Sequence, residues 1–202
     1  MTAASPAEPR TESGRNGVLR SALVTVTIFA VIAALAWFMG QAGAGTGAQG
    51  VTLSARAAGP APKMGEPAPG FQLLDLEGEP VTLADFRGRP VWITFWASWC
   101  PPCRAEAPDI EATYERHSDA GLVVLALDLG EDAETVRGYT ERTGLSFVVL
   151  LDQYTEVAAA YRITGIPTHY FVDAGGILRD RRIGPMGGDE MERRILDLLA
   201  VE

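Results

Sequence analysis

Short apolar runs rich in β-branched and aromatic residues recur along the last two thirds of the chain and predict β-strands. These runs are residues 71–76, 81–83, 91–97, 122–129, 147–152, 168–173 and 177–183. Segments with helical spacing predict helices at residues 101–117 (kinked at Pro108), 132–143, 154–161 and 188–200. Strands that alternate with helices and end in a hairpin predict one α/β domain with a mixed sheet, over residues 67–202.

A different pattern occupies residues 21–39, an uncharged and mostly apolar run with no polar face. A helix of this length spans roughly 30 Å, the thickness of the hydrocarbon core of a bilayer. Three arginines precede the run, whereas the next basic residue after it is Arg56. The positive-inside rule therefore predicts a cytoplasmic tail at residues 1–20, a single-pass membrane anchor at 21–39, and an extracytoplasmic location for the rest.

Residues 40–66 are rich in Gly, Ala and Pro and show no periodicity. This composition cannot bury enough apolar surface to offset its chain entropy, so we expect a flexible linker. Its small residues also leave cleavage open as an alternative to a retained anchor. Residues 1–66 carry five Lys/Arg and three Asp/Glu, whereas residues 67–202 carry twelve and twenty-three. Because such an acidic body repels phosphate, nucleic acid is not expected as a partner.

The chain has two cysteines, both within the sequence WASWCPPC at residues 96–103. A structural disulfide between Cys100 and Cys103 would add little stability, because disulfides stabilise mainly by closing long loops. A closed zinc site needs about four ligands, and the two histidines, His117 and His169, lack the required spacing. A copper(I) dithiolate stays open, because thiolates suit that soft ion. A redox pair is the other alternative.

The position of the two cysteines favours redox chemistry. Cys100 follows a predicted strand and opens a predicted helix, where backbone N–H groups and the helix dipole lower a thiol pKa. Its thiolate can attack a client disulfide, and Cys103, one turn along, can resolve the mixed disulfide. Pro101 and Pro102 suit the first helical positions but remove two N–H donors. Their presence predicts a reducing rather than an oxidising couple.

Residues 91–108, VWITFWASWCPPCRAEAP, resemble the active-site strand and helix of the thioredoxin superfamily. The likeness is greatest to the membrane-anchored TlpA/ResA-like thiol-disulfide oxidoreductases. Residues 132–151 resemble the insertion which that branch carries in the thioredoxin core. Further similar segments are residues 65–76, 82–88 and 165–176.

The resemblance implies a thioredoxin-like fold and thiol-disulfide exchange at a redox-active Cys100–Cys103 disulfide, with no other cofactor and no metal. It also implies clients outside the cytoplasm that carry disulfides or thiols, such as apocytochrome c or metal-site assembly proteins. The electron donor would be a membrane protein of the thiol-transfer type.

The same resemblance implies roles for individual residues. Cys100 would be the exposed nucleophile and Cys103 the resolving cysteine. Pro167 would be a cis-proline facing the disulfide, and its neighbour Ile166 would offer backbone groups to a bound peptide. Trp96 and Trp99 resemble the aromatic residues that flank the site, with packing in the core as the alternative, which is favoured for Trp96. The substrate-binding surface would comprise Trp99, Pro101, Pro102, Ile166 and Pro167.

Glu106, three residues after Cys103, resembles the active-site glutamate of the ResA-like branch, with a carboxylate on a solvated helix face as the alternative. Typical thioredoxins carry a buried Asp six residues before the first cysteine, and this chain has Thr94 there. Glu106 is therefore the nearest candidate base for Cys103. A peroxiredoxin-like peroxidase is a further alternative, since residues 65–88 resemble that group. Such a peroxidase needs a Thr three residues before its reactive Cys, and that position here is Ala97.

Overall fold

The computed structural model describes residues 61–201 of the chain. The predicted tail at 1–20, the anchor at 21–39 and most of the linker at 40–66 lie outside the described residues. Within the described residues, no helix is both long and apolar enough to cross a membrane. Gly65 and Glu66 fall within the predicted linker, but they form backbone hydrogen bonds with Leu178. These two residues therefore belong to the folded region.

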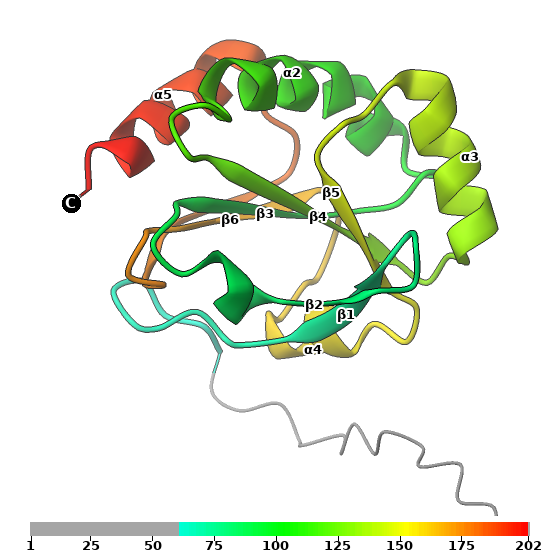
Figure 1. Ribbon diagram of the computed structural model, residues 1–202, viewed down its shortest axis with the longest axis horizontal. Coiled ribbons are helices and arrows are strands. Elements are labelled where there is room, and N and C mark those ends of the chain that lie inside the picture. The colour runs from blue at the N-terminus through cyan, green and yellow to red at the C-terminus, as the bar shows by residue number, and fades with distance from the viewer. Residues whose placement is uncertain (1–60, 202) are drawn as a thin grey trace, which may run out of the picture. The chain divides into compact units, whose positions relative to one another are not determined.

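A mixed sheet of seven strands forms the centre of the described region (Figure 1). The strands are β1 (Gln72–Asp75), β2 (Pro80–Thr82), β3 (Val91–Trp96), β4 (Val123–Leu129), β5 (Val148–Asp152), β6 (Thr168–Val172) and β7 (Leu178–Ile183). Their order across the sheet is β2-β1-β5-β4-β3-β6-β7. β3, β4 and β5 run parallel, whereas β1 is antiparallel to β5, and β6 is antiparallel to both β3 and β7. The predicted α/β fold with a mixed sheet is confirmed.

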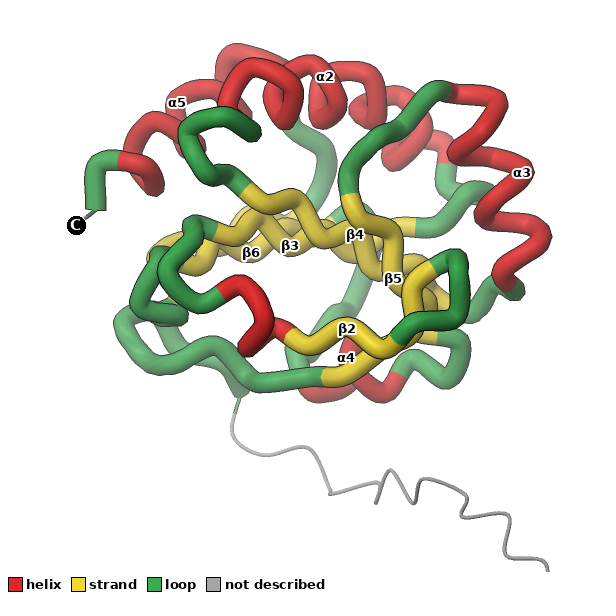
Figure 2. The backbone as a smooth tube through the Cα atoms, viewed as in Figure 1, coloured by secondary structure: helices red, strands yellow, loops and turns green. Residues whose placement is uncertain are grey.

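Helices cover both faces of this sheet. They are α2 (Pro101–His117), α3 (Ala133–Thr143), α4 (Glu156–Ala160), α5 (Gly188–Leu199) and the short 3-10 helix η1 (Leu83–Phe86). Figures 1 and 2 show α2, α3 and α5 over one face and α4 on the other. Each predicted helix and strand is present to within two residues at either end, and α2 stays one helix across Pro108. The 3-10 helix was not predicted, because four residues are too few to show a period.

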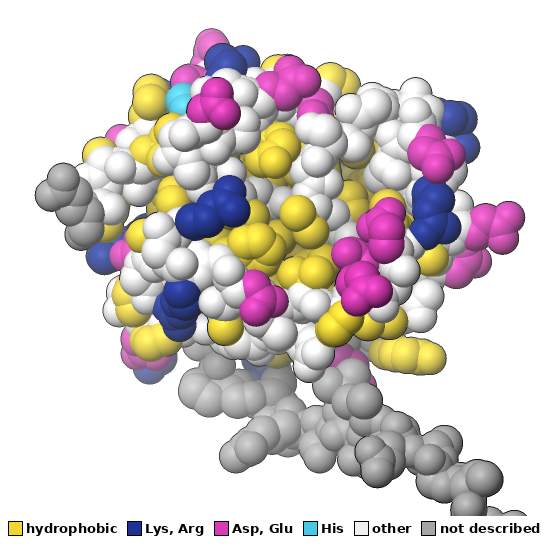
Figure 3. Space-filling model, in the orientation of Figure 1, with side chains coloured by type: hydrophobic (Ala, Val, Ile, Leu, Met, Phe, Trp, Pro, Cys, Tyr) yellow, Lys and Arg dark blue, Asp and Glu magenta, His cyan; other side chains and the backbone are white. Residues whose placement is uncertain are grey.

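Strand β3 separates two hydrophobic cores, because successive side chains of a strand point to opposite faces. All six of its residues are buried, as predicted for a strand covered on both faces. Trp92, Thr94 and Trp96 face α2, whereas Val91, Ile93 and Phe95 face α4. On the surface in Figure 3, acidic and basic side chains are interspersed around apolar side chains near the centre. The chain leaves β3 beneath α2 and reaches Cys100 four residues later and Cys103 seven residues later.

Candidate active site

A disulfide joins Cys100 and Cys103 at the N-terminus of α2. Cys100 is the N-cap residue of this helix, and Pro101 and Pro102 take its first two positions. Because proline has no N–H group, the first backbone donor of the helix is that of Cys103, which donates to Cys100 Sγ at 3.3 Å. The helix N-terminus therefore directs a single N–H group at the Cys100 sulfur.

The two sulfurs are equally buried but have different surroundings. Each cysteine is only 2% exposed, so the expectation of an exposed Cys100 is wrong for this disulfide form. The physical reason is the loop before β6, whose Ile166 carbonyl oxygen lies 3.9 Å from Cys100 Sγ. The Ile166–Pro167 peptide bond in this loop is cis. Trp99, directly before Cys100, is 62% exposed and presents a large apolar surface beside the covered sulfur.

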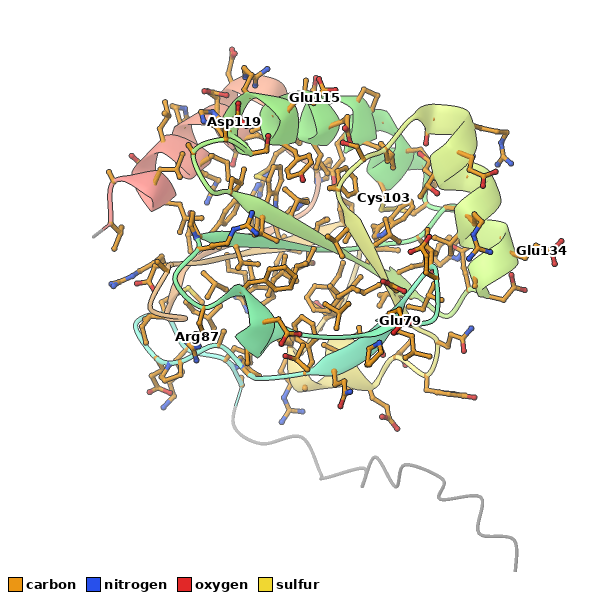
Figure 4. All side chains as sticks on the ribbon, viewed as in Figure 1. Glu79, Arg87, Cys103, Glu115, Asp119 and Glu134 are labelled. Carbon is orange, nitrogen blue, oxygen red and sulfur yellow. A yellow bond between two sulfur atoms is a disulfide. The ribbon has the colours of Figure 1, made fainter. Side chains whose placement is uncertain are left out.

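Cys103 lies on the inner side, between α2 and the sheet, whereas Glu115 and Asp119 lie at the outer surface (Figure 4). It borders a cavity of about 10 Å³, which is near the lower limit for holding one water molecule. The cavity is lined by Thr94, Trp96, Cys103, Glu106, Ala107, Ile110, Ala126, Leu145 and Phe147. Among these lining residues, Glu106 carries the one carboxyl group.

Glu106 is buried rather than solvated, with an exposed fraction of 3%. The alternative of a carboxylate on a solvated helix face is therefore wrong. Residues three apart on a helix share a face, so Glu106 lies on the same side of α2 as Cys103. Its Oε2 accepts a hydrogen bond from the backbone N–H of Met186 at 3.1 Å, and its Oε1 lies 3.4 Å from Nε2 of His169.

Two further carboxyl groups support the loop that leads to Cys100. Glu131 accepts hydrogen bonds from the backbone N–H of Ser98 at 2.6 Å and from its hydroxyl at 2.7 Å. Asp128, near the carboxyl end of β4, is fully buried and accepts the backbone N–H of Glu131 at 3.3 Å. Burial, reinforced by the adjacent Glu131 side chain, raises the pKa of Asp128 to about 8. Asp128 is therefore mostly protonated at neutral pH.

This arrangement gathers most of the residues that the sequence singled out. Cys100, Cys103, Glu106 and Ile166 meet around the N-terminal half of α2, with Trp96 in the core against Tyr139. Pro167 follows Ile166 across the cis peptide bond. Sequence reasoning missed the residues that hold this group in place: Ser98, Asp128, Glu131, His169 and the backbone of Met186. One of them carried a usable signal, because Asp128 is a lone acid at the carboxyl end of an otherwise apolar strand.

Residues 64–181 match the AhpC/TSA family. The chain belongs to this family. It is 34% identical over 132 residues to the thiol-disulfide oxidoreductase ResA of Geobacillus kaustophilus. The aligned segment covers 65% of this chain and 76% of that protein. It is also 32% identical over 130 residues to the ResA protein of Bacillus anthracis, covering 64% of this chain and 75% of the relative. The recognised resemblance to ResA-like oxidoreductases is confirmed.

Solved structures agree with this assignment. A thiol:disulfide interchange protein of the thioredoxin family from Chlorobium tepidum superposes with a TM-score of 0.62 and 28% identity, over 69% of this chain and 100% of that one. StoA from Bacillus subtilis superposes with a TM-score of 0.55 and 27% identity, over 64% of this chain and 97% of that one. The fold is thioredoxin-like, and the protein is a thiol-disulfide oxidoreductase.

Proposed function

We propose that this oxidoreductase reduces disulfide bonds of client proteins outside the cytoplasm, with the Cys100–Cys103 dithiol as the reductant. The Cys100 thiolate attacks one sulfur of the client disulfide, and the other client sulfur leaves as a thiolate that takes up a proton. Cys103 then gives its proton to Glu106 and attacks Cys100 Sγ, which releases the second client thiolate. This thiolate takes up a proton in turn, and Glu106 releases the proton that it accepted. The client thereby gains two electrons and two protons, and the enzyme ends as the disulfide.

The observation that carries this proposal is the unequal environment of the two sulfurs. Cys103 borders the inner cavity together with the carboxyl group of Glu106, whereas Cys100 is the N-cap of α2 and lies beside the Ile166 carbonyl. A base within the protein suits the cysteine that acts second, after the client has covered the site. The 62% exposed Trp99 supplies apolar surface for the client next to Cys100.

The clients and the electron donor are proposed from the family resemblance. Apocytochrome c and metal-site assembly proteins both present cysteines outside the cytoplasm that must be reduced before they bind haem or metal. The enzyme would be returned to its dithiol form by a membrane protein of the thiol-transfer type. An anchor at residues 21–39 would keep the catalytic domain close to that donor.

The direction of the reaction is tested by the reduction potential of the Cys100–Cys103 pair. Because Pro101 and Pro102 withhold two N–H donors from the Cys100 thiolate, we expect a potential nearer to the reducing end (about −270 mV) than to the oxidising end (about −120 mV) of the thioredoxin superfamily. The measurement is equilibration of the full-length protein, in detergent, with dithiothreitol or glutathione redox buffers. Pro102→Ala restores a donor and should make the couple more oxidising. A wild-type value above about −180 mV would instead indicate an oxidase.

The orientation of the chain in the membrane is tested by protease treatment of intact spheroplasts. We expect residues 61–201 to be digested from outside, because the arginines before residue 21 favour a cytoplasmic N-terminus. A cytoplasmic protein that survives the treatment shows that the membrane stayed sealed, and digestion after detergent lysis shows that the protease can cleave the domain. Protection of the domain in sealed spheroplasts contradicts this orientation.

A further inference from the structure

A fully buried imidazole lies under α2, on the strand that follows the cis-proline loop. His169 is 0% exposed and occupies the second position of β6. In the sheet register it is paired with Thr94 of β3 on one side and with Arg182 of β7 on the other. Thr94 borders the cavity that also contacts Cys103 and Glu106. His169 therefore lies next to the site, although the mechanism above does not use it.

The hydrogen bond from Trp92 fixes which ring nitrogen of His169 carries the proton. Trp92 Nε1 lies 3.3 Å from His169 Nδ1, and because an indole N–H can only donate, Nδ1 must be the acceptor. The proton of the neutral ring is thereby assigned to Nε2.

The protonated nitrogen of His169 faces the active-site carboxyl group. Nε2 and Glu106 Oε1 are 3.4 Å apart in a contact that is not aligned as a hydrogen bond, and among the described residues neither atom has a hydrogen-bond partner. The other oxygen, Oε2, accepts the backbone N–H of Met186. Buried polar atoms without a partner are rare in native proteins. Two such atoms that face each other point to an interaction that the fold maintains.

We propose that His169 is a positioning residue, which holds the Glu106 carboxylate as the proton acceptor for Cys103. This inference rests on the proposed role of Glu106 in resolution. The backbone N–H of Met186 and Nε2 of His169 face the two oxygens of this carboxyl group. Groups that face both oxygens fix the plane of the carboxyl group beside the cavity that Cys103 also borders.

The experiment separates the attack by Cys100 from the resolution by Cys103. Full-length reduced protein is mixed with dithionitrobenzoate in a stopped-flow instrument. The first coloured thiolate is released when Cys100 attacks the probe, and the second when Cys103 resolves the mixed disulfide. We compare His169→Leu, which removes the donor, with His169→Gln, which keeps an N–H donor near the place of Nε2. His117→Gln serves as the matched control, because His117 is the other histidine of the chain and pairs with Glu192 of α5 at the far end of α2 from the cysteines.

For His169→Leu we expect the second phase to slow by about tenfold or more, a part of the 10²- to 10⁴-fold that a general base typically contributes. The first phase should stay unchanged. His169→Gln should largely restore the second phase, and His117→Gln should match the wild type in both. In a Glu106→Gln background, His169→Leu should cause no further slowing, because both changes remove the same function. A residue that only supports the fold would slow both phases or add its effect to that of Glu106→Gln.

Two outcomes overturn the inference. If Glu106→Gln slows resolution while His169→Leu leaves it at the wild-type rate, Glu106 acts without His169. If Glu106→Gln itself has no effect, the proposed role of Glu106 fails and the inference fails with it, although reduction by the cysteine pair still stands. Should His169→Leu not fold, the comparison uses Trp92→Phe, which removes the donor to Nδ1. That variant should also slow the second phase, and a wild-type rate there contradicts the proposal.

Discussion

A Cys103→Ser variant is expected to stop after one chemical step and to stay covalently bound to its client. Cys100 makes the first attack, and only a second thiol can then break the bond between Cys100 and the client. Serine has nearly the same size but its hydroxyl does not displace a sulfur. The reduced full-length variant, mixed with insulin, should form a one-to-one adduct that survives non-reducing electrophoresis. Its catalysed insulin reduction by dithiothreitol should fall to the uncatalysed rate.

Cys100→Ser is the matched control for this trap. It keeps Cys103, which borders the inner cavity under α2, and should give neither an adduct nor any acceleration of insulin reduction. Mass spectrometry of the digested adduct identifies the cysteine that holds the client. An adduct on Cys103 in the Cys100→Ser variant, with none in Cys103→Ser, would reverse the assigned roles. Catalysis by both single variants would exclude the dithiol mechanism.

The fold was predictable because its strongest signals are local. The run at 91–97 is a nearly continuous stretch of β-branched and aromatic residues, and Pro101 and Pro102 follow it closely, so both its burial and the start of α2 follow from sequence. The burial of Glu106 was also available from the sequence. The buried positions of α2 are Cys103, Glu106, Ala107, Ile110 and Thr113, which follow one helical stripe. The charge of Glu106 favours a solvated side chain, whereas its position on this stripe favours burial.

The support around the disulfide was not predictable, because it depends on contacts between distant segments. His169 meets Trp92 and Glu106 only once β6 has paired with β3 and α2 has packed over both. The donor from Met186 is a backbone N–H group, to which its side chain gives no clue. The covered sulfur of Cys100 likewise results from the approach of a loop 66 residues away. Residue type and spacing therefore identified the reacting groups, whereas the groups that position them required the tertiary structure.

An Asp128→Asn variant should be more stable than the wild type at alkaline pH and about equally stable in acid. Burial is the main reason that the pKa of Asp128 is raised from 3.8 to about 8. Between these two values the folded protein keeps a proton that the unfolded chain releases, so the stability of the wild type falls as pH rises through this window. Below this pH window Asp128 is protonated in both the folded and the unfolded protein. Above the window the folded wild type bears the full cost of a buried charge.

Asparagine suits this site because it keeps the shape of the protonated acid without its titration. Its carbonyl oxygen can still accept the backbone N–H of Glu131, and its amide N–H group can donate to the Glu131 carboxylate, which holds Ser98. The neighbouring Asp152 adds repulsion when Asp128 is charged, and the variant removes this too. We therefore expect a gain of roughly 1–3 kcal/mol in the free energy of unfolding near pH 8, with insulin reduction preserved.

Urea unfolding of the oxidised full-length protein near pH 4, 6 and 8 measures this effect. Asp119→Asn is the control, since Asp119 is exposed on the turn after α2 and its replacement removes the same charge (Figure 4). Its free energy of unfolding should differ from the wild type by a nearly constant amount at the three pH values. The difference for Asp128→Asn should grow from near zero in acid to its full value at about pH 8. If that difference does not change with pH, Asp128 is not the buried proton carrier beneath the active-site loop, and the loop is held by Glu131 alone.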